Sequence, residues 1–172
     1  MNPYTQVRKV PLFYNNVQSN AFSVQINGDD SEGRNFWKEV GNVSDKYLLV
    51  PNQEVKEMTN DVIADSGLSW EPLKQFWDGK RYMDSYICKS ETAPIKVGDD
   101  VGLGISFWNS YDGSTALSFR LFIVRLLCTN GMLSKHFFHT YRFKHDKSNE
   151  NYYKEITNVS DIIRNSGDKV AA

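Results

Sequence analysis

The most hydrophobic run of the chain, LSFRLFIVRLL at residues 117–127, predicts a β-strand. Apolar side chains occupy both alternating faces of this run, so we expect an interior strand of a sheet that is covered on both sides. A short apolar segment at 104–108 precedes it, and the residues between them include NSYDGS, whose Asn, Asp and Gly are typical of tight turns. The pattern therefore predicts a central β-hairpin at about residues 104–128.

Four other segments have the composition of strands. Pro3 and Pro11 allow only an edge strand near the N-terminus, because proline cannot donate to a central ladder. The other three segments are rich in alternating or continuous apolar residues and are bounded by turn residues. The strands are expected at 7–14, 22–26, 46–50 and 81–88.

Two segments have the features of helices. Apolar residues spaced three and four apart at 53–66 predict an amphipathic helix, with Asn52 as its N-cap and Gly67 at its C-terminal end. A shorter capped helix is expected at about 158–164. The intervening segments, 70–77 and 90–100, are interpreted as a connection and a loop.

These elements predict an α+β fold with a single domain. We expect a mostly antiparallel sheet built around the 104–128 hairpin, with one or two helices packed on one face. The chain of 172 residues is long enough for one hydrophobic core. Residues 1–20 are expected to form an extended arm, 21–165 the α+β domain, and 166–172 a frayed tail.

Composition narrows the class of protein. Hydrophobic residues make up 40% and charged residues 24%, which is typical of a globular protein, and the net charge of −1 means that any anion-binding surface is local. Without a signal peptide or a membrane span, we expect a cytoplasmic protein (in the host cytoplasm if viral) and no membrane partner. Cys88 and Cys128 are expected to be free thiols. No metal-ligand spacing stands out, so neither a metal nor a cofactor is expected.

The hairpin turn and the end of the strand that follows it carry a family resemblance. NSYDGS at 109–114 and RLLCTNGM at 125–132 resemble the pattern N-S-(Y or H)-D-G-S followed by R-(V, I or L)-x-C-x-N. This pattern is similar to that of the phage- and plasmid-borne proteins grouped as domain of unknown function 932. The resemblance covers about residues 40–135 and implies a mobile-element or viral setting with a role in DNA metabolism. The motif positions are Asn109, Tyr111, Asp112, Gly113, Arg125, Cys128, Asn130 and Gly131.

A basic and aromatic segment, SKHFFHTYRFKHDK at 134–147, contains all three histidines of the chain. With neutral histidines its four cations and one acid give +3, so the rest of the chain carries −4. Single-stranded nucleic acid requires cations for its phosphates and flat rings for its bases. The alternative is an ordinary element whose aromatic residues face the core and whose cations face water.

Two arginines interrupt the hydrophobic strand. Arg120 and Arg125 have opposite parity, so a regular strand places them on opposite faces, unless a bulge lies between them. A guanidinium stays charged and is costly to bury alone. Each arginine is therefore expected to pair with an acid, to reach water or to contact a phosphate.

Our first functional hypothesis is a non-enzymatic nucleic-acid-binding protein that acts on single-stranded DNA in replication, recombination or annealing. Such a protein can assemble into a homo-oligomer. Arginines and lysines would contact phosphates, and Tyr141 and Phe143 would stack on bases. The residues expected to bind nucleic acid are Arg120, Arg125, Lys135, His139, Tyr141, Arg142, Phe143, Lys144 and Lys147.

Two other classes of function stay open. A protein-interaction module, such as an inhibitor of a host defence system, would bind a host protein through exposed aromatic residues. A thiol enzyme would combine Cys128 with His136 or His139, oriented by Asp112. An apolar strand disfavours the thiolate, so we expect no catalytic site.

Overall fold

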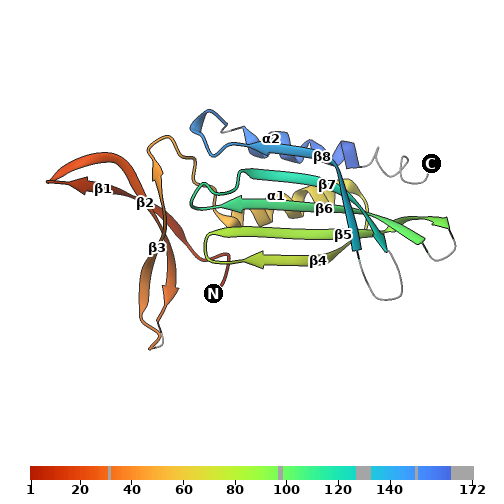
Figure 1. The fold of residues 1–172 in the computed structure, drawn as a ribbon, viewed down its shortest axis with the longest axis horizontal. Coiled ribbons are helices and arrows are strands. Elements are labelled where there is room, and N and C mark those ends of the chain that lie inside the picture. The colour runs from red at the N-terminus through yellow and green to blue at the C-terminus, as the bar shows by residue number, and fades with distance from the viewer. Residues whose placement is uncertain (31, 97–98, 127–132, 150, 164–172) are drawn as a thin grey trace.

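The strands form two antiparallel sheets in the computed structural model, which describes residues 1–30, 32–96, 99–126, 133–149 and 151–163 (Figure 1). The first sheet has the order β1-β2-β3 and the second the order β4-β5-β6-β7-β8. The strands are β1 (Val7–Tyr14), β2 (Val17–Asp29), β3 (Asn35–Ser44), β4 (Trp70–Trp77), β5 (Arg81–Lys96), β6 (Asp99–Ser110), β7 (Leu117–Leu126) and β8 (Leu133–Phe143).

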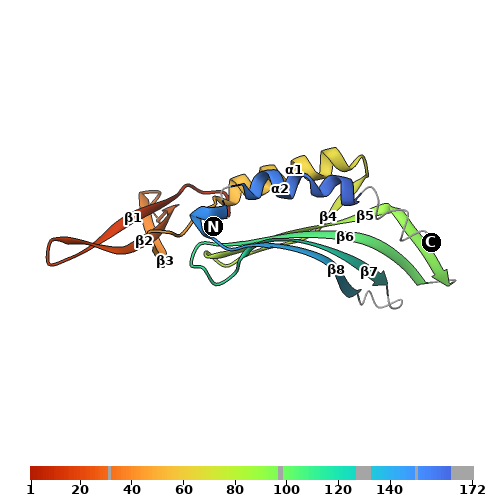
Figure 2. The same cartoon turned by 90° about the horizontal axis from the view of Figure 1, so that it is seen from above.

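Two helices cover one face of the five-stranded sheet. They are α1 (Asn52–Ser66) and α2 (Tyr152–Thr157), and helical residues continue at 159–163. A short 3₁₀ helix, η1 (Lys147–Asn149), follows β8. Figure 2 shows both helices on the same side of the sheet, which curves away from them at the end far from the first sheet. The arrangement confirms the expected α+β fold with helices on one face; we call the opposite side the helix-free face.

The main hydrophobic core lies between the helices and the five-stranded sheet. Apolar residues one turn apart on α1 face the sheet, and alternate residues of the strands face the helix. The buried residues of this core include Val55, Met58 and Val62 of α1, Leu103, Ile105 and Phe107 of β6, and Leu117, Phe119 and Leu121 of β7.

A smaller core joins the two sheets. Val24, Ile26 and Val40 from the first sheet pack with Tyr111, which follows β6. The backbones also approach closely here, because a Cβ added at Gly41 of β3 would lie 2.7 Å from the Cβ of Asp112. The β6–β7 turn is therefore the joint between the first sheet and the rest of the molecule.

Several local predictions are confirmed. The helix at 52–66 ends at Gly67, whose φ of 69° is the left-handed conformation that glycine adopts easily. The 104–126 part of the predicted hairpin is β6 paired with β7, and the predicted edge strand at 7–14 is β1, which pairs only with β2.

Other local predictions are wrong. Pro51, not Asn52, is the N-cap of α1, and the side chain of Asn52 instead donates a hydrogen bond of 2.9 Å to the carbonyl of Pro3. Residues 46–50 are not a strand; two backbone hydrogen bonds, from Leu48 N–H to the His145 carbonyl and from Lys147 N–H to the Lys46 carbonyl, join this segment to 145–147 outside the two sheets. The segment 70–77 is not a connection but strand β4. It lies at the edge of its sheet, where Pro72 is tolerated, and a bulge lies between Pro72 and Lys74.

The environment of β7 also differs from the prediction. It is an interior strand, as expected, but the helices cover only one of its faces. On the other face the ring of Phe122 lies over Gly104, where an added Cβ would come within 2.1 Å of the ring. Phe122 is thus buried by its neighbours in the same sheet. The predicted loop at 90–100 is also wrong, because β5 extends to Lys96 and β6 begins at Asp99.

Candidate functional site

The helix-free face carries rows of side chains that cross all five strands. Directly opposite residues of paired antiparallel strands point to the same side, so the register defines each row. Small serines near the centre of the rows leave space for the long side chains of Trp108 and Arg120. One row is Phe76, Met83, Trp108, Ser118 and Arg142, and the next is Lys74, Ser85, Ser106, Arg120 and Thr140.

Cations and aromatic rings are in contact on this face. The guanidinium carbon of Arg120 lies 4.9 Å from the centre of the Trp108 ring, whose indole N–H donates a hydrogen bond of 3.2 Å to the Ser106 hydroxyl. Burial lowers the pKa of Arg120, and the positive charge of Arg142 lowers it further, although the guanidinium stays charged at neutral pH. These two arginines concentrate positive charge beside Trp108.

The edge of the same face adds further cations. Lys74 is exposed on β4, and the Arg81 guanidinium lies 5.9 Å from the Phe76 ring while pairing with Asp78 at 2.7 Å. Glu71, opposite Ile87, is an acid on this side. The face is therefore basic, and its strongest positive charge lies over β7 and β8.

The helix on the other side of the sheet is acidic. Helix α1 contains four acidic residues and one lysine, namely Glu54, Glu57, Asp61, Asp65 and Lys56. Two of these acids accept hydrogen bonds from tyrosines of α2. The near-neutral chain thus places a net negative charge on α1 and a net positive charge on the helix-free face.

The structure divides the predicted basic segment between two faces. Arg142 lies on the helix-free face opposite Ser118, whereas Tyr141 and Phe143 are partly buried against the main core. His139 is exposed, and its Nε2 lies 2.9 Å from the Tyr141 hydroxyl. The two rings that were expected to stack on bases therefore contact the core on the helix side.

The face on which some other predicted site residues lie is outside what the structure describes. Arg125 and Lys135 belong to β7 and β8, but their side chains lie outside what the structure describes. The motif residues Cys128, Asn130 and Gly131, and with them the thiol-site hypothesis, also lie outside the described residues.

Sequence reasoning missed three residues of the helix-free face: Lys74, Phe76 and Trp108. Lys74 and Phe76 belong to a segment that we had interpreted as a connection, so its alternation was not used. The dense aromatic content of 70–77, with Trp at both ends, was the signal that could have indicated a strand. Trp108 was assigned to a strand, but its face depends on the register with β5 and β7.

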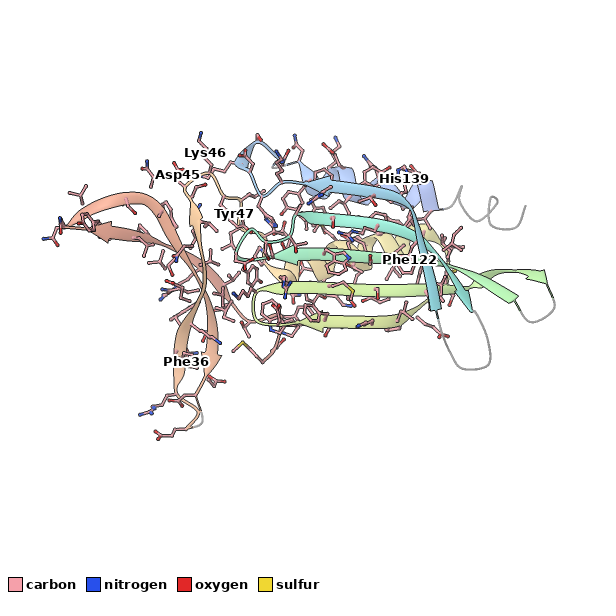
Figure 3. All side chains as sticks on the ribbon, viewed as in Figure 1. Phe36, Asp45, Lys46, Tyr47, Phe122 and His139 are labelled. Atoms are coloured by element: carbon pink, nitrogen blue, oxygen red, sulfur yellow. The ribbon has the colours of Figure 1, made fainter. Side chains whose placement is uncertain are left out.

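A pocket of about 600 Å³ opens at the end of the helix-free face, beside the β6–β7 turn. Figure 3 views this face and labels Tyr47 next to the turn. The Tyr47 ring stacks on His145 with centroids 4.8 Å apart, and its hydroxyl donates a hydrogen bond of 2.7 Å to the Ser110 carbonyl. The pocket is lined by Tyr47, Gly113, Ser114, Ala116, Arg142, Lys144 and His145.

His145 is fixed in the wall of this pocket. Its Nδ1 lies 2.9 Å from the Leu48 carbonyl, which is an acceptor and so requires a proton on that nitrogen. Burial lowers the pKa of His145 from its ordinary value, although backbone hydrogen bonds to Leu48 and Thr115 partly oppose this effect. The positive charge of the pocket at neutral pH therefore comes from Arg142 and Lys144.

The NSYDGS turn has an evident structural role. The Asn109 side-chain amide donates hydrogen bonds of 2.8 Å to the Val50 carbonyl and to Oδ1 of Asn52. The Tyr111 hydroxyl accepts a bond of 2.8 Å from the Asn52 backbone N–H. These contacts fix the start of α1 to the turn. Asp112 closes the turn by accepting the Ser114 N–H at 3.0 Å.

A buried polar cluster lies on the helix side of β5. One oxygen of Asp84 accepts hydrogen bonds from the hydroxyls of Tyr86 at 2.6 Å and Tyr82 at 3.2 Å, and pairs with the Lys56 ammonium at 2.9 Å. Burial and the Asp84 carboxylate raise the pKa of Tyr86 to about 12. The Lys56 ammonium of α1 thus pairs with a buried carboxylate of β5, and this ion pair anchors α1 to the sheet.

The described part of the chain has neither a metal-binding cluster nor a membrane-spanning helix. No group of three or more histidines, cysteines or acids there is arranged to hold a metal. None of the helices in that part has the length and apolar character needed to cross a membrane. Cys88 of β5 is fully buried.

A family model described as "Domain of unknown function (DUF932)" matches residues 39–172. The matched region contains the five-stranded sheet, both helices, the β6–β7 turn and the pocket, and it begins inside β3. No curated protein and no solved structure matches the chain.

Proposed function

The chain belongs to the DUF932 family, whose description assigns no activity, and we propose from its geometry that it is a non-enzymatic protein that binds single-stranded nucleic acid, preferentially DNA. The helix-free face is the binding surface in this proposal. The observation that carries it is the arrangement of Arg120 and Arg142 beside the Trp108 ring.

This arrangement supplies the two interactions that a single strand requires. Arg120, Arg142 and Lys74 are positioned to contact phosphates. The exposed Phe76 ring and the partly buried Trp108 ring, beside Arg120, are the aromatic groups on which bases would stack, at about 1–3 kcal/mol per base. Tyr141 and Phe143 pack on the core, so in this proposal the bases stack on rings of the helix-free face and not on these two residues.

A single strand suits this face better than a duplex. Bases in a duplex are already stacked on one another, whereas an open strand can place its bases flat on a sheet. A protein of this kind acts during replication, recombination or annealing, and the resemblance to phage- and plasmid-borne proteins favours such a setting.

The test is fluorescence anisotropy of a labelled single-stranded oligonucleotide, with a matched duplex, across a salt series. We expect the logarithm of the affinity to fall linearly with the logarithm of the salt concentration, and the single strand to bind more tightly than the duplex. The double variant Lys74→Ala/Arg142→Ala should lower the salt slope by about 1.4, because each lost phosphate contact removes about 0.7. Trp108→Ala should weaken binding by about 1–3 kcal/mol.

Lys38→Ala is the control for loss of a positive charge elsewhere on the molecule, because it removes an exposed lysine of the first sheet. Its affinity and salt slope should equal those of the wild type. Absence of binding by the wild-type protein at low salt would overturn the proposal, as would equal effects of the control and the Lys74 and Arg142 substitutions.

A protein-interaction module is the second candidate, and one observation favours it. The tip of the β1–β2 hairpin exposes three apolar side chains: Phe13 is 63% exposed, Tyr14 76% and Val17 69%. If a host protein binds this tip, Phe13→Ser/Tyr14→Ser should abolish its capture from host lysate, while Lys74→Ala/Arg142→Ala should leave capture unchanged.

A further inference from the structure

The pocket beside the β6–β7 turn has the chemistry of an anion site. Its lining contains the guanidinium of Arg142, the ammonium of Lys144 and the hydroxyl of Ser114, and it contains no acidic side chain. Two acids adjoin the lining in sequence. Asp112 accepts the Ser114 N–H, and Asp146 accepts the Ser148 N–H and hydroxyl. The bonds from Ser148, together with the positive charges of Lys46 and Lys144, lower the pKa of Asp146. A ligand that fills this pocket therefore meets donors and positive charge.

These donors are available to a ligand. Within the described residues neither Arg142 nor Lys144 forms an ion pair, and the Ser114 hydroxyl makes no hydrogen bond. Arg142 and Lys144 are exposed, so no buried partner competes for them. Three free donors around one opening are a cluster that a multiply charged oxyanion can satisfy together.

The rest of the pocket lining is held in place by contacts of its own. Tyr47 is fixed by its bond to Ser110 and by stacking on His145, and Gly113 holds the turn with a φ of 76°. The volume of about 600 Å³ is in the range of small-molecule sites and exceeds the size of a lone phosphate. The pocket thus has room for a phosphate together with the sugar that carries it.

We infer that this pocket binds a phosphate monoester, such as the terminal phosphate of a nucleic-acid strand or that of a free nucleotide. A monoester carries about 1.5 to 2 negative charges at neutral pH, against one for an internal phosphodiester, so two cations favour a terminal phosphate. The strand as the source of this phosphate rests on the proposed function.

Arg142 connects the pocket to the helix-free face. It lines the pocket, and it also lies in the same row as Trp108, with its positive charge near Arg120. A strand that crosses Trp108 and Arg120 can therefore end beside Arg142 and Lys144. The face would bind the body of the strand and the pocket its phosphorylated end.

The experiment compares oligothymidylates of about 20 nucleotides that carry a 5′-phosphate, a 3′-phosphate or only hydroxyl ends. One phosphorylated end should bind about tenfold more tightly than the hydroxyl form, which is the strength of one charge-assisted contact. Lys144→Ala and Ser114→Ala should each reduce this preference. Lys38→Ala, which removes an exposed cation on the first sheet outside the pocket lining, should preserve it.

Calorimetric titration with thymidine monophosphate and with thymidine separates the two sources of phosphate. In one outcome, thymidine monophosphate binds, thymidine does not, and Lys144→Ala weakens the binding. If the oligonucleotides then bind equally well with and without a terminal phosphate, the ligand of the pocket is a free nucleotide. Monophosphate binding without any oligonucleotide binding would retain the pocket and overturn the proposed function. No preference for phosphate in either assay, or a preference that survives both Lys144→Ala and Ser114→Ala, would overturn the inference while leaving the function of the face intact.

Discussion

At the scale of single residues, one hydroxyl links the family motif to the start of α1. Burial raises the pKa of Tyr111 to about 12, so its hydroxyl is protonated at neutral pH and its oxygen accepts the Asn52 N–H. Tyr111→Phe keeps the ring but leaves this buried N–H without its acceptor. We expect the free energy of unfolding to fall by about 1–2 kcal/mol, measured by urea denaturation.

Tyr14→Phe is the control for the same chemical change. Tyr14 is 76% exposed at the hairpin tip, and we expect its substitution to alter the free energy of unfolding by less than about 0.5 kcal/mol. If Tyr111→Phe unfolds at the same urea concentration as the wild type, the hydroxyl does not stabilise the start of α1.

At the scale of elements, the pairing of β6 with β7 depends on a glycine beneath an aromatic ring. The Phe122 ring occupies the space in which a Cβ at position 104 would lie. Gly104→Ala should therefore lower the free energy of unfolding by about 1–3 kcal/mol through overpacking, as measured in urea. The cost should be smaller in a Phe122→Leu background, because leucine can withdraw from the added methyl group.

Gly102, two residues earlier on β6, offers a comparison for this substitution. A Cβ there would lie 3.3 Å from the end of the flexible Ile87 side chain, which can move aside. We expect Gly102→Ala to cost less than Gly104→Ala. The role of the Phe122 ring would be contradicted if Gly102→Ala and Gly104→Ala lowered the free energy of unfolding equally. It would also be contradicted if Gly104→Ala lowered it equally in the wild-type and Phe122→Leu backgrounds.

At the scale of the whole molecule, the two sheets meet where β3 touches the β6–β7 turn. A Cβ at Gly41 would lie 2.7 Å from the Cβ of Asp112 and 2.8 Å from its Cα, so backbone must move to admit it. Gly41→Ala should lower the free energy of unfolding by about 1–3 kcal/mol and increase hydrogen exchange of first-sheet amides.

Gly28→Ala tests the same substitution away from this joint. Its Cβ would meet the Phe36 ring at 3.5 Å, an ordinary contact, so exchange at the joint should stay unchanged. Unaltered exchange in Gly41→Ala would indicate that the sheets are held together by other contacts.

The sequence predicted those elements that are marked by residues close together in the chain. Helix α1 has apolar residues at helical spacing and Gly67 at its end, and the β6–β7 hairpin has its turn residues in one short run. Strand β4 was missed because Pro72 and its bulge interrupt the alternation. In the basic segment, the sequence could not decide which of Tyr141, Arg142 and Phe143 faces the core, because that depends on the pairing with β7.

The pocket was beyond sequence reasoning for a different reason. Its lining comes from residue 47, from the turn at 113–116, and from residues 142–145 at the end of β8 and just after it. Tertiary contacts, such as the stacking of Tyr47 on His145, bring these segments together. The turn motif could be recognised, but its two roles, in fixing α1 and in lining a pocket, depend on neighbours that are far away in the chain.

The separation of charge between α1 and the helix-free face gives the molecule an electric dipole that its net charge of −1 conceals. A molecule of this kind orients itself in the field of a charged surface before it makes contact. Towards a polyanion it turns the face that carries Arg120 and Arg142, and towards a polycation it turns α1. The protein should therefore be retained at low ionic strength on both cation-exchange and anion-exchange resins, each resin holding it by the opposite side.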